Sequence, residues 1–126
     1  MWFFKKNVIL TISLSDKEEY EVLFSTIRDL LNNSGNEGQA LVIENLMNLL
    51  SIEITDDFLK LINSVDMWGG SGAVWEVNID DENKYKCFQQ AIINLIDLME
   101  RTGVLKYLGI KSRRRLFRRI LNNNPR

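Results

Sequence analysis

Residues 15–35, SDKEEYEVLFSTIRDLLNNSG, decide the fold of this chain. Ser15 and Glu18 match the S-x-x-E capping box, in which two side chains satisfy backbone N–H groups where a helix begins. Asn33-Ser34-Gly35 supplies residues that end helices. Between these signals the apolar residues recur three and four positions apart: Tyr20, Leu23, Phe24, Ile27, Leu30 and Leu31. The stretch therefore predicts an amphipathic helix that must pack its apolar face against other elements.

Four further segments show helical periodicity: 36–50, 55–65, 80–103 and 112–121. Asn36 and Thr55 are suitable N-caps for the first two, and Gly103 is a suitable stop for the third. Length and composition fit one domain, residues 1–126, in which 45% apolar residues can build a core. We therefore predict a mainly α, single-domain bundle of about four to five helices.

Two stretches, 8–14 and 73–79, alternate apolar and polar residues in the manner of strands. They could pair with each other as a small two-stranded β element on the helical body. Equally, Ser71 could cap a short helix that begins at Gly72, because serine is a favoured N-cap. Both alternatives stay open, since an isolated pair of strands is marginally stable without support.

The composition points away from catalysis. The chain has no histidine, which removes histidine-activated nucleophiles, imidazole acid–base catalysis and histidine metal sites. Cys87, the one cysteine, cannot form an intramolecular disulfide and is expected as a small core residue. We therefore expect no catalytic residues, no cofactor and no bound metal.

The N-terminal residues lack an export-signal pattern, and no run of about 18 apolar residues could span a membrane. A lone cysteine also fits a reducing compartment. A cytoplasmic protein is the expectation.

Charge is unevenly distributed along the chain. Residues 1–110 hold 9 Lys and Arg against 17 Asp and Glu, a net charge of −8, whereas residues 111–126 hold 7 basic residues and no acid. Within residues 15–82 the balance is 3 basic against 15 acidic residues, a net charge of −12. Such a separation bears on partners and association rates rather than on fold.

The acidic segment has two interpretations. Its carboxylates could be solvated helix faces and N-terminal partners of helix dipoles. Alternatively, they could attract a basic partner such as a nuclease active site, because complementary charge accelerates association. A hard metal ion at Asp80-Asp81-Glu82 is the weaker explanation, since the start of a helix accounts for this run. The acidic candidates for partner binding are Asp56, Asp57, Asp66, Glu76, Asp80, Asp81 and Glu82.

The loop SVDMWGGSGAVWEV, residues 64–77, places two tryptophans around a glycine-rich turn. In one interpretation Gly69 or Gly70 takes a positive φ that ends the preceding helix, and the indoles cap the core. In the other, a rigid exposed loop grips a partner through backbone amides and indoles, since tryptophan is enriched among binding hot spots. The candidate contacts of the second interpretation are Trp68, Gly69, Gly70, Ser71, Gly72 and Trp75.

The basic C-terminal segment, residues 111–126, is predicted as a helix or tail. Its arginines could bind RNA, DNA or an anionic membrane surface. We favour instead a helix folded back on the acidic body, because that body would repel phosphate backbones. The apolar residues expected to close the core from this helix are Leu116, Phe117 and Ile120.

The sequence DMWGGSGAVWEV, followed by FQQAIINLIDLMERTGVL, resembles small bacterial immunity proteins encoded beside polymorphic or contact-dependent growth inhibition toxins. The resemblance covers residues 55–105, and the matching positions are Trp68, Gly69, Gly70 and Gly72. It implies a small cytosolic protein without catalysis that binds and neutralises a toxin, often a nuclease. The alternative is a nucleic-acid-associated or regulatory module that uses the arginine-rich helix.

Overall fold

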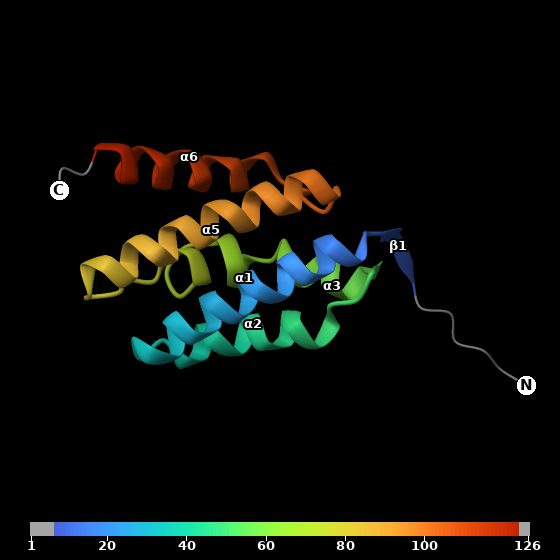
Figure 1. Cartoon of the computed structure of the whole chain (residues 1–126), viewed down its shortest axis with the longest axis horizontal. Helices are drawn as coiled ribbons and strands as arrows, with labels where there is room; N and C mark the ends of the chain where they lie inside the picture. Colours follow the sequence, from blue (N-terminus) through green and yellow to red (C-terminus); the bar gives the residue numbers. More distant parts are fainter. Residues whose placement is uncertain (1–6, 124–126) are drawn as a thin grey trace, which may run out of the picture.

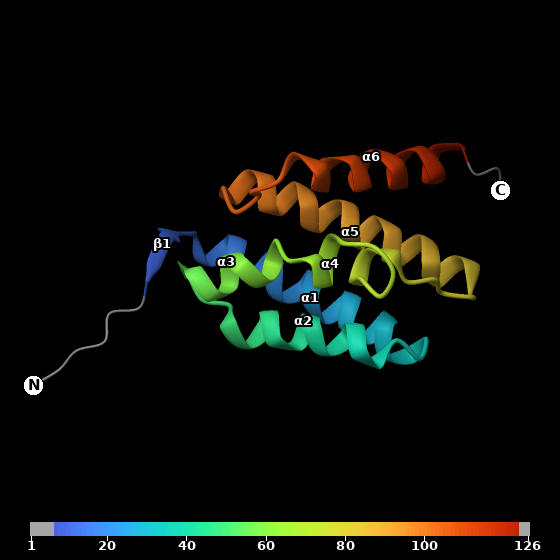
Figure 2. The same ribbon diagram turned by 180° about the vertical axis from the view of Figure 1, so that it is seen from behind.

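The computed structural model of the chain describes residues 7–123, and its four longest helices lie side by side in the order α2, α1, α5, α6 (Figure 1). Neighbouring helices in this row run in opposite directions (Figures 1 and 2). Each helix thus covers the apolar face of the next, which is the usual packing solution for amphipathic helices. Their bounds are Glu37–Leu49 for α2, Leu14–Asn33 for α1, Glu82–Thr102 for α5 and Leu108–Asn123 for α6.

A second layer of short elements lies across one face of the row, as Figure 2 shows. It comprises α3 (Asp56–Ile62), α4 (Val65–Trp68) and the 3₁₀ helix η1 (Val74–Glu76). The antiparallel strands β1 (Val8–Thr11) and β2 (Glu53–Thr55) pair at the end where α1 begins. The structure therefore confirms the predicted mainly α bundle with a small two-stranded β element.

The core is one contiguous cluster that extends from β1 to α6. At its centre the ring of Tyr20 lies 5.6 Å from that of Phe24 and 5.9 Å from that of Phe58, so α1 and α3 share aromatic contacts. The Tyr20 hydroxyl lies 2.7 Å from Oγ1 of Thr102, which links α1 to the end of α5. Burial raises the pKa of Tyr20 to about 12, so the phenol stays neutral at physiological pH.

Helix boundaries follow the predicted caps with one correction. Thr55 caps α3 by accepting a hydrogen bond from Phe58 N at 3.4 Å, and Gly103 ends α5 with φ +83°. The cap of α1 is Ser13, not Ser15, and its hydroxyl accepts from Asp16 N at 3.0 Å. Ser13 follows β1 and has the extended backbone that an N-cap requires, whereas Ser15 lies inside the first helical turn.

Neither alternative for residues 73–79 is correct, because they form no strand paired with residues 8–14 and the residue before η1 is Ala73, not Ser71. The partner of β1 is β2, with Leu10 opposite Ile54. Residues 73–79 instead form η1 between extended residues at Ala73 and Val77. The apolar side chains of this segment reach the core without strand pairing, and their burial does not alternate, because the neighbours Ala73 and Val74 are both buried along with Val77 and Ile79.

Candidate functional site

The first tryptophan of the glycine-rich loop belongs to the core. Trp68 is 5% exposed, and its Nε1 donates a hydrogen bond to the Ile62 carbonyl at 2.6 Å. Buried indoles need such a partner for their N–H group. For Trp68 the structure therefore agrees with the interpretation in which the indole caps the core, because little of the ring is left for a partner to contact.

The second tryptophan joins the loop to α6. Trp75 is half-buried, and its Nε1 donates to the Gly69 carbonyl at 2.8 Å. Its ring lies 5.8 Å from the ring of Phe117, and the Arg113 guanidinium lies 4.9 Å from the ring centre, within cation–π range. The two indoles thus fix a loop that its glycines would otherwise leave flexible.

The glycines of this loop play different roles from those predicted. Gly69 has φ −75°, and the positive φ of +90° occurs at Gly72. Gly69 is required for another reason: a Cβ at this position would lie 2.7 Å from the Val65 carbonyl oxygen. Gly72 accepts a hydrogen bond from Gln39 at 3.0 Å, so α2 also holds the loop, while the loop residues left exposed are Gly70, Ser71 and Gly72.

The predicted acidic residues do not form a single surface. Asp56 and Asp57 begin α3 beside the small sheet, where Asp56 pairs with Lys60 at 2.9 Å. A second group lies around the start of α5, at the opposite end of this 21-residue helix, which is about 30 Å long. That group comprises Glu76, Asp80, Asp81 and Glu82, whereas Asp66 lies exposed on α4.

Three residues of the second acidic group have local partners, and for Asp80 the partner is the neutral side chain of Asn78, whose Nδ2 donates at 3.4 Å. Asp81 is the N-cap of α5, and its carboxylate accepts from Lys84 N at 2.9 Å. Glu82 lies 3.6 Å from Lys86. Within residues 7–123, no three His, Cys, Asp or Glu side chains form a group that could hold a metal ion.

The basic segment folds back as a helix, and α5 supplies its counter-charges. Arg114 lies 2.7 Å from Asp97 and 2.8 Å from Glu100, and Arg118 also reaches Asp97. Phe117 is 2% exposed and extends the core, as predicted. The same expectation is wrong for Leu116 and Ile120, which are each 39% exposed because their side of α6 faces away from α5.

Arg115 and Arg119 are exposed, and neither forms an ion pair within residues 7–123. They are the exposed cations of α6 that a nucleic acid would meet without displacing a carboxylate. None of the helices within residues 7–123 combines the length and the apolar composition that a membrane span requires.

Cys87 was expected in the core but is exposed on α5, because the buried face of that helix passes through its neighbour Phe88.

Glu100 makes the docking of α6 sensitive to acid. Hydrogen bonds from Lys111 and Arg114 lower the pKa of this carboxyl from 4.5 to about 2. Because its pKa is lower in the folded state than in the unfolded state, Glu100 contributes stability above pH 4.5 that is lost as the pH falls toward about 2. Thermal unfolding followed across this pH range should therefore show a steeper acid-induced loss of stability for the wild type than for Glu100→Gln.

Glu18→Gln is the control for this prediction, because Glu18 is exposed and forms no ion pair within residues 7–123. This variant should follow the wild type across the whole pH range. Equal pH dependence in Glu100→Gln and the wild type would show that the Lys111–Glu100–Arg114 contact contributes nothing to folding.

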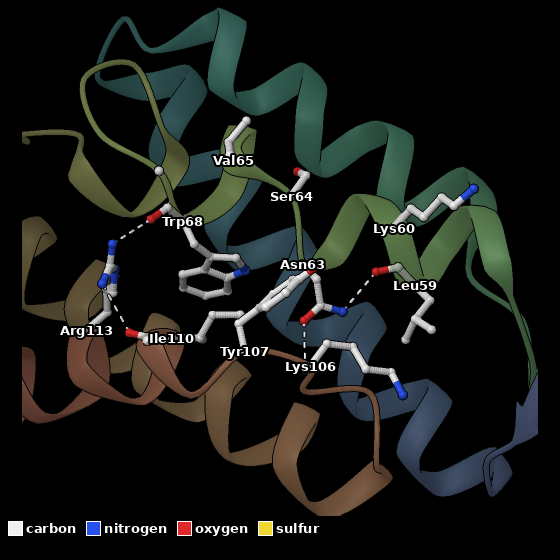
Figure 3. A pocket seen from close by; sticks show the side chains of 12 residues that line it. Leu59, Lys60, Asn63, Ser64, Val65, Trp68, Lys106, Tyr107, Ile110 and Arg113 are labelled. Carbon is white, nitrogen blue, oxygen red and sulfur yellow. Dashed lines mark hydrogen bonds between the residues drawn. The ribbon is translucent and has the colours of Figure 1, made fainter.

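A groove that the sequence did not reveal opens between α3–α4 and the α5–α6 connection (Figure 3). Its volume is about 700 Å³, and Trp68 and Gly69 are the predicted contact residues that line it. Exposed apolar side chains border it, with Val65 79% exposed and Tyr107 62% exposed. No pattern in the sequence predicts this groove, because its walls come from segments about 40 residues apart that helix packing brings together.

Comparisons with protein-family models, with curated proteins and with solved structures gave no match for this chain. Its function must therefore be inferred from its surfaces.

Proposed function

We propose that this protein is an immunity-type protein, which binds a cognate bacterial toxin and neutralises it by covering a basic surface. The observation that carries the proposal is a set of carboxylates around the exposed turn 70–72, at the end of the bundle where α2 and α5 begin. We call them the loop-end acids: Glu37, Glu76, Asp80, Asp81 and Glu82.

Charge balance supports a basic partner at this end. Glu37, Glu76 and Asp80 are exposed and form no ion pair within residues 7–123. Helix α6 lies at the opposite edge of the row from α2 (Figure 1), and α5 pairs with half of its six described cations, which are Lys111, Arg114 and Arg118. A basic surface that approached the loop-end acids would thus meet uncompensated negative charge, which accelerates encounter.

Rigidity of the loop supports the same function. The turn between α4 and η1 is fixed by three hydrogen bonds, from Trp68 to Ile62, from Trp75 to Gly69 and from Gln39 to Gly72. A surface that is already ordered loses little conformational entropy on binding. In this proposal the tryptophans act by holding the loop, and the exposed turn and the loop-end acids make the contact.

The first experiment identifies the toxin and tests protection. The tagged protein is used to capture its partner from the native host at low salt, and the partner is identified by mass spectrometry. The captured toxin domain is then expressed with and without this protein. The proposal requires one stoichiometric basic partner whose toxicity is abolished by co-expression. Recovery of nucleic acid alone would favour the arginine-helix alternative.

The second experiment tests the surface with matched charge reversals. Glu37→Lys, Glu76→Lys and Asp80→Lys combined should slow association at low salt by about tenfold or more, because steering is lost. The control combines Glu18→Lys, Glu44→Lys and Glu53→Lys, which changes the net charge equally at positions away from the loop end. Association rates measured against salt would contradict the proposal if both triple variants bind alike or if salt has no effect.

A further inference from the structure

The groove between α3–α4 and the start of α6 combines an apolar floor with cations. Figure 3 shows Trp68, Ile110 and Tyr107 between Arg113 on one side and Lys106 on the other. Lys60 is the third cation of the lining, and no carboxylate from residues 7–123 lines the groove. Small-molecule sites typically have this size and character, with a mostly apolar wall and a few placed polar groups.

Arg113 is the unusual cation of this lining. Its guanidinium donates to the carbonyl oxygens of Trp68 and Gly109 at 2.9 and 3.1 Å, and to the Ser112 hydroxyl at 3.1 Å. All three acceptors are neutral, and Arg113 forms no ion pair with any residue in the range 7–123. Its Nε is buried without a hydrogen-bond partner. A half-buried guanidinium held only by neutral groups lacks the counter-charge that normally offsets its desolvation.

A second polar group on the groove wall also lacks a partner. The Ser64 hydroxyl is buried, and nothing within residues 7–123 bonds to it. Ser64 precedes α4, yet its side chain makes no capping hydrogen bond. Buried polar atoms usually have a partner, so this hydroxyl is an unpaired donor beside the groove. The positive end of the α6 dipole at Gly109 adds to the attraction for an anion.

We propose that this groove binds an organic carboxylate with an apolar body. The carboxylate supplies the missing counter-charge to Arg113, and the apolar body lies against the exposed side chains of Tyr107 and Val65, above the floor formed by the buried Trp68 and Ile110. Arginine is suited to this role because its planar donors match carboxylate oxygens. The site contains none of the loop-end acids, so it stands independently of the proposed toxin surface.

The test uses decanoate, below its micelle concentration, as the probe. Binding is followed by tryptophan fluorescence in a Trp2→Phe background, because Trp68 lines the groove and Trp2 lies outside the described residues. Decanoate should bind about tenfold or more tightly than decanol, which has the same chain but no charge. Decyltrimethylammonium should bind more weakly than decanol. If decanol binds as tightly as decanoate, the groove is only an apolar surface and the proposal fails.

Two exposed valines provide a matched pair of variants. Val65 is 79% exposed and lines the groove, so Val65→Glu places a carboxylate at the edge of the groove. Val22 is 66% exposed on α1, so Val22→Glu places a carboxylate away from it. Both variants should fold, since neither side chain belongs to the core. Val65→Glu should weaken decanoate about tenfold, and Val22→Glu should leave its affinity unchanged. Equal affinity in the two variants would overturn the proposal.

Discussion

Replacing Trp68 with alanine is expected to lower the free energy of unfolding by about 3–5 kcal/mol, the usual cost of truncating a buried aromatic side chain. The indole is 5% exposed and belongs to the contiguous core, so its removal leaves a cavity under α4. It also removes the donor that satisfies the Ile62 carbonyl. Urea unfolding followed by circular dichroism measures the change, provided that the slope against urea concentration is unchanged.

Two variants separate the contributions to this loss. Trp68→Phe retains most of the apolar contact but leaves the Ile62 carbonyl unsatisfied, so it should cost about 1–3 kcal/mol. Tyr107→Ala removes an aromatic side chain that is 62% exposed and should cost less than about 1 kcal/mol. A Trp68→Ala protein as stable as Tyr107→Ala would show that the loop is detached from the core.

Replacing Phe117 with alanine is expected to cost a similar amount, about 3–5 kcal/mol. This residue is 2% exposed, contacts the Trp75 ring and extends the core into α6. If α6 unfolds together with the rest of the bundle, the variant should still unfold in a single cooperative transition, at a lower temperature or urea concentration than the wild type. Thermal and urea unfolding, each followed by two spectroscopic probes, test both the size of the loss and its cooperativity.

Leu116→Ala is the matched control on the same helix, because Leu116 is 39% exposed and adjacent in sequence. It should lower stability by less than about 1 kcal/mol. If Phe117→Ala costs no more than Leu116→Ala, α6 is an appendage rather than part of the core. The arginine-rich helix would then be free for nucleic acid, as the alternative function requires.

Helical periodicity predicted the long elements because each helix buries one continuous stripe. In α5 the periodic residues Phe88, Ile92 and Leu95 are buried, whereas Tyr85, which fits the same spacing, is half-buried. Alternation of apolar and polar residues was misleading at 73–79, where the 3₁₀ helix η1 buries Val74 as well as its neighbour Ala73 and no strand forms. It also missed β2, because three residues are too few to show a pattern.

The candidate site was harder to predict than the fold because it depends on distances between elements. The acidic residues form one segment in sequence, yet packing places Asp56 and Asp80 near opposite ends of α5. An indole that caps the core has the same sequence signature as one that binds a partner, and only the exposure of Trp68 distinguishes them. The proposed carboxylate site depends on Arg113 having no ion pair. That absence is visible only once the segments around Arg113 are placed in space, so no single segment could reveal it.

The order of helices in the row also has a consequence for how the chain assembles. The pairs α1–α2 and α5–α6 are each joined by a short connection, so their contacts are local and need little loop closure. The packing of α1 on α5 joins residues more than 80 apart, such as Tyr20 and Thr102. Closing that large loop costs more chain entropy than closing either hairpin. We therefore expect the chain to fold by the docking of two halves, with α3, α4 and the tryptophan loop as the segment that tethers them.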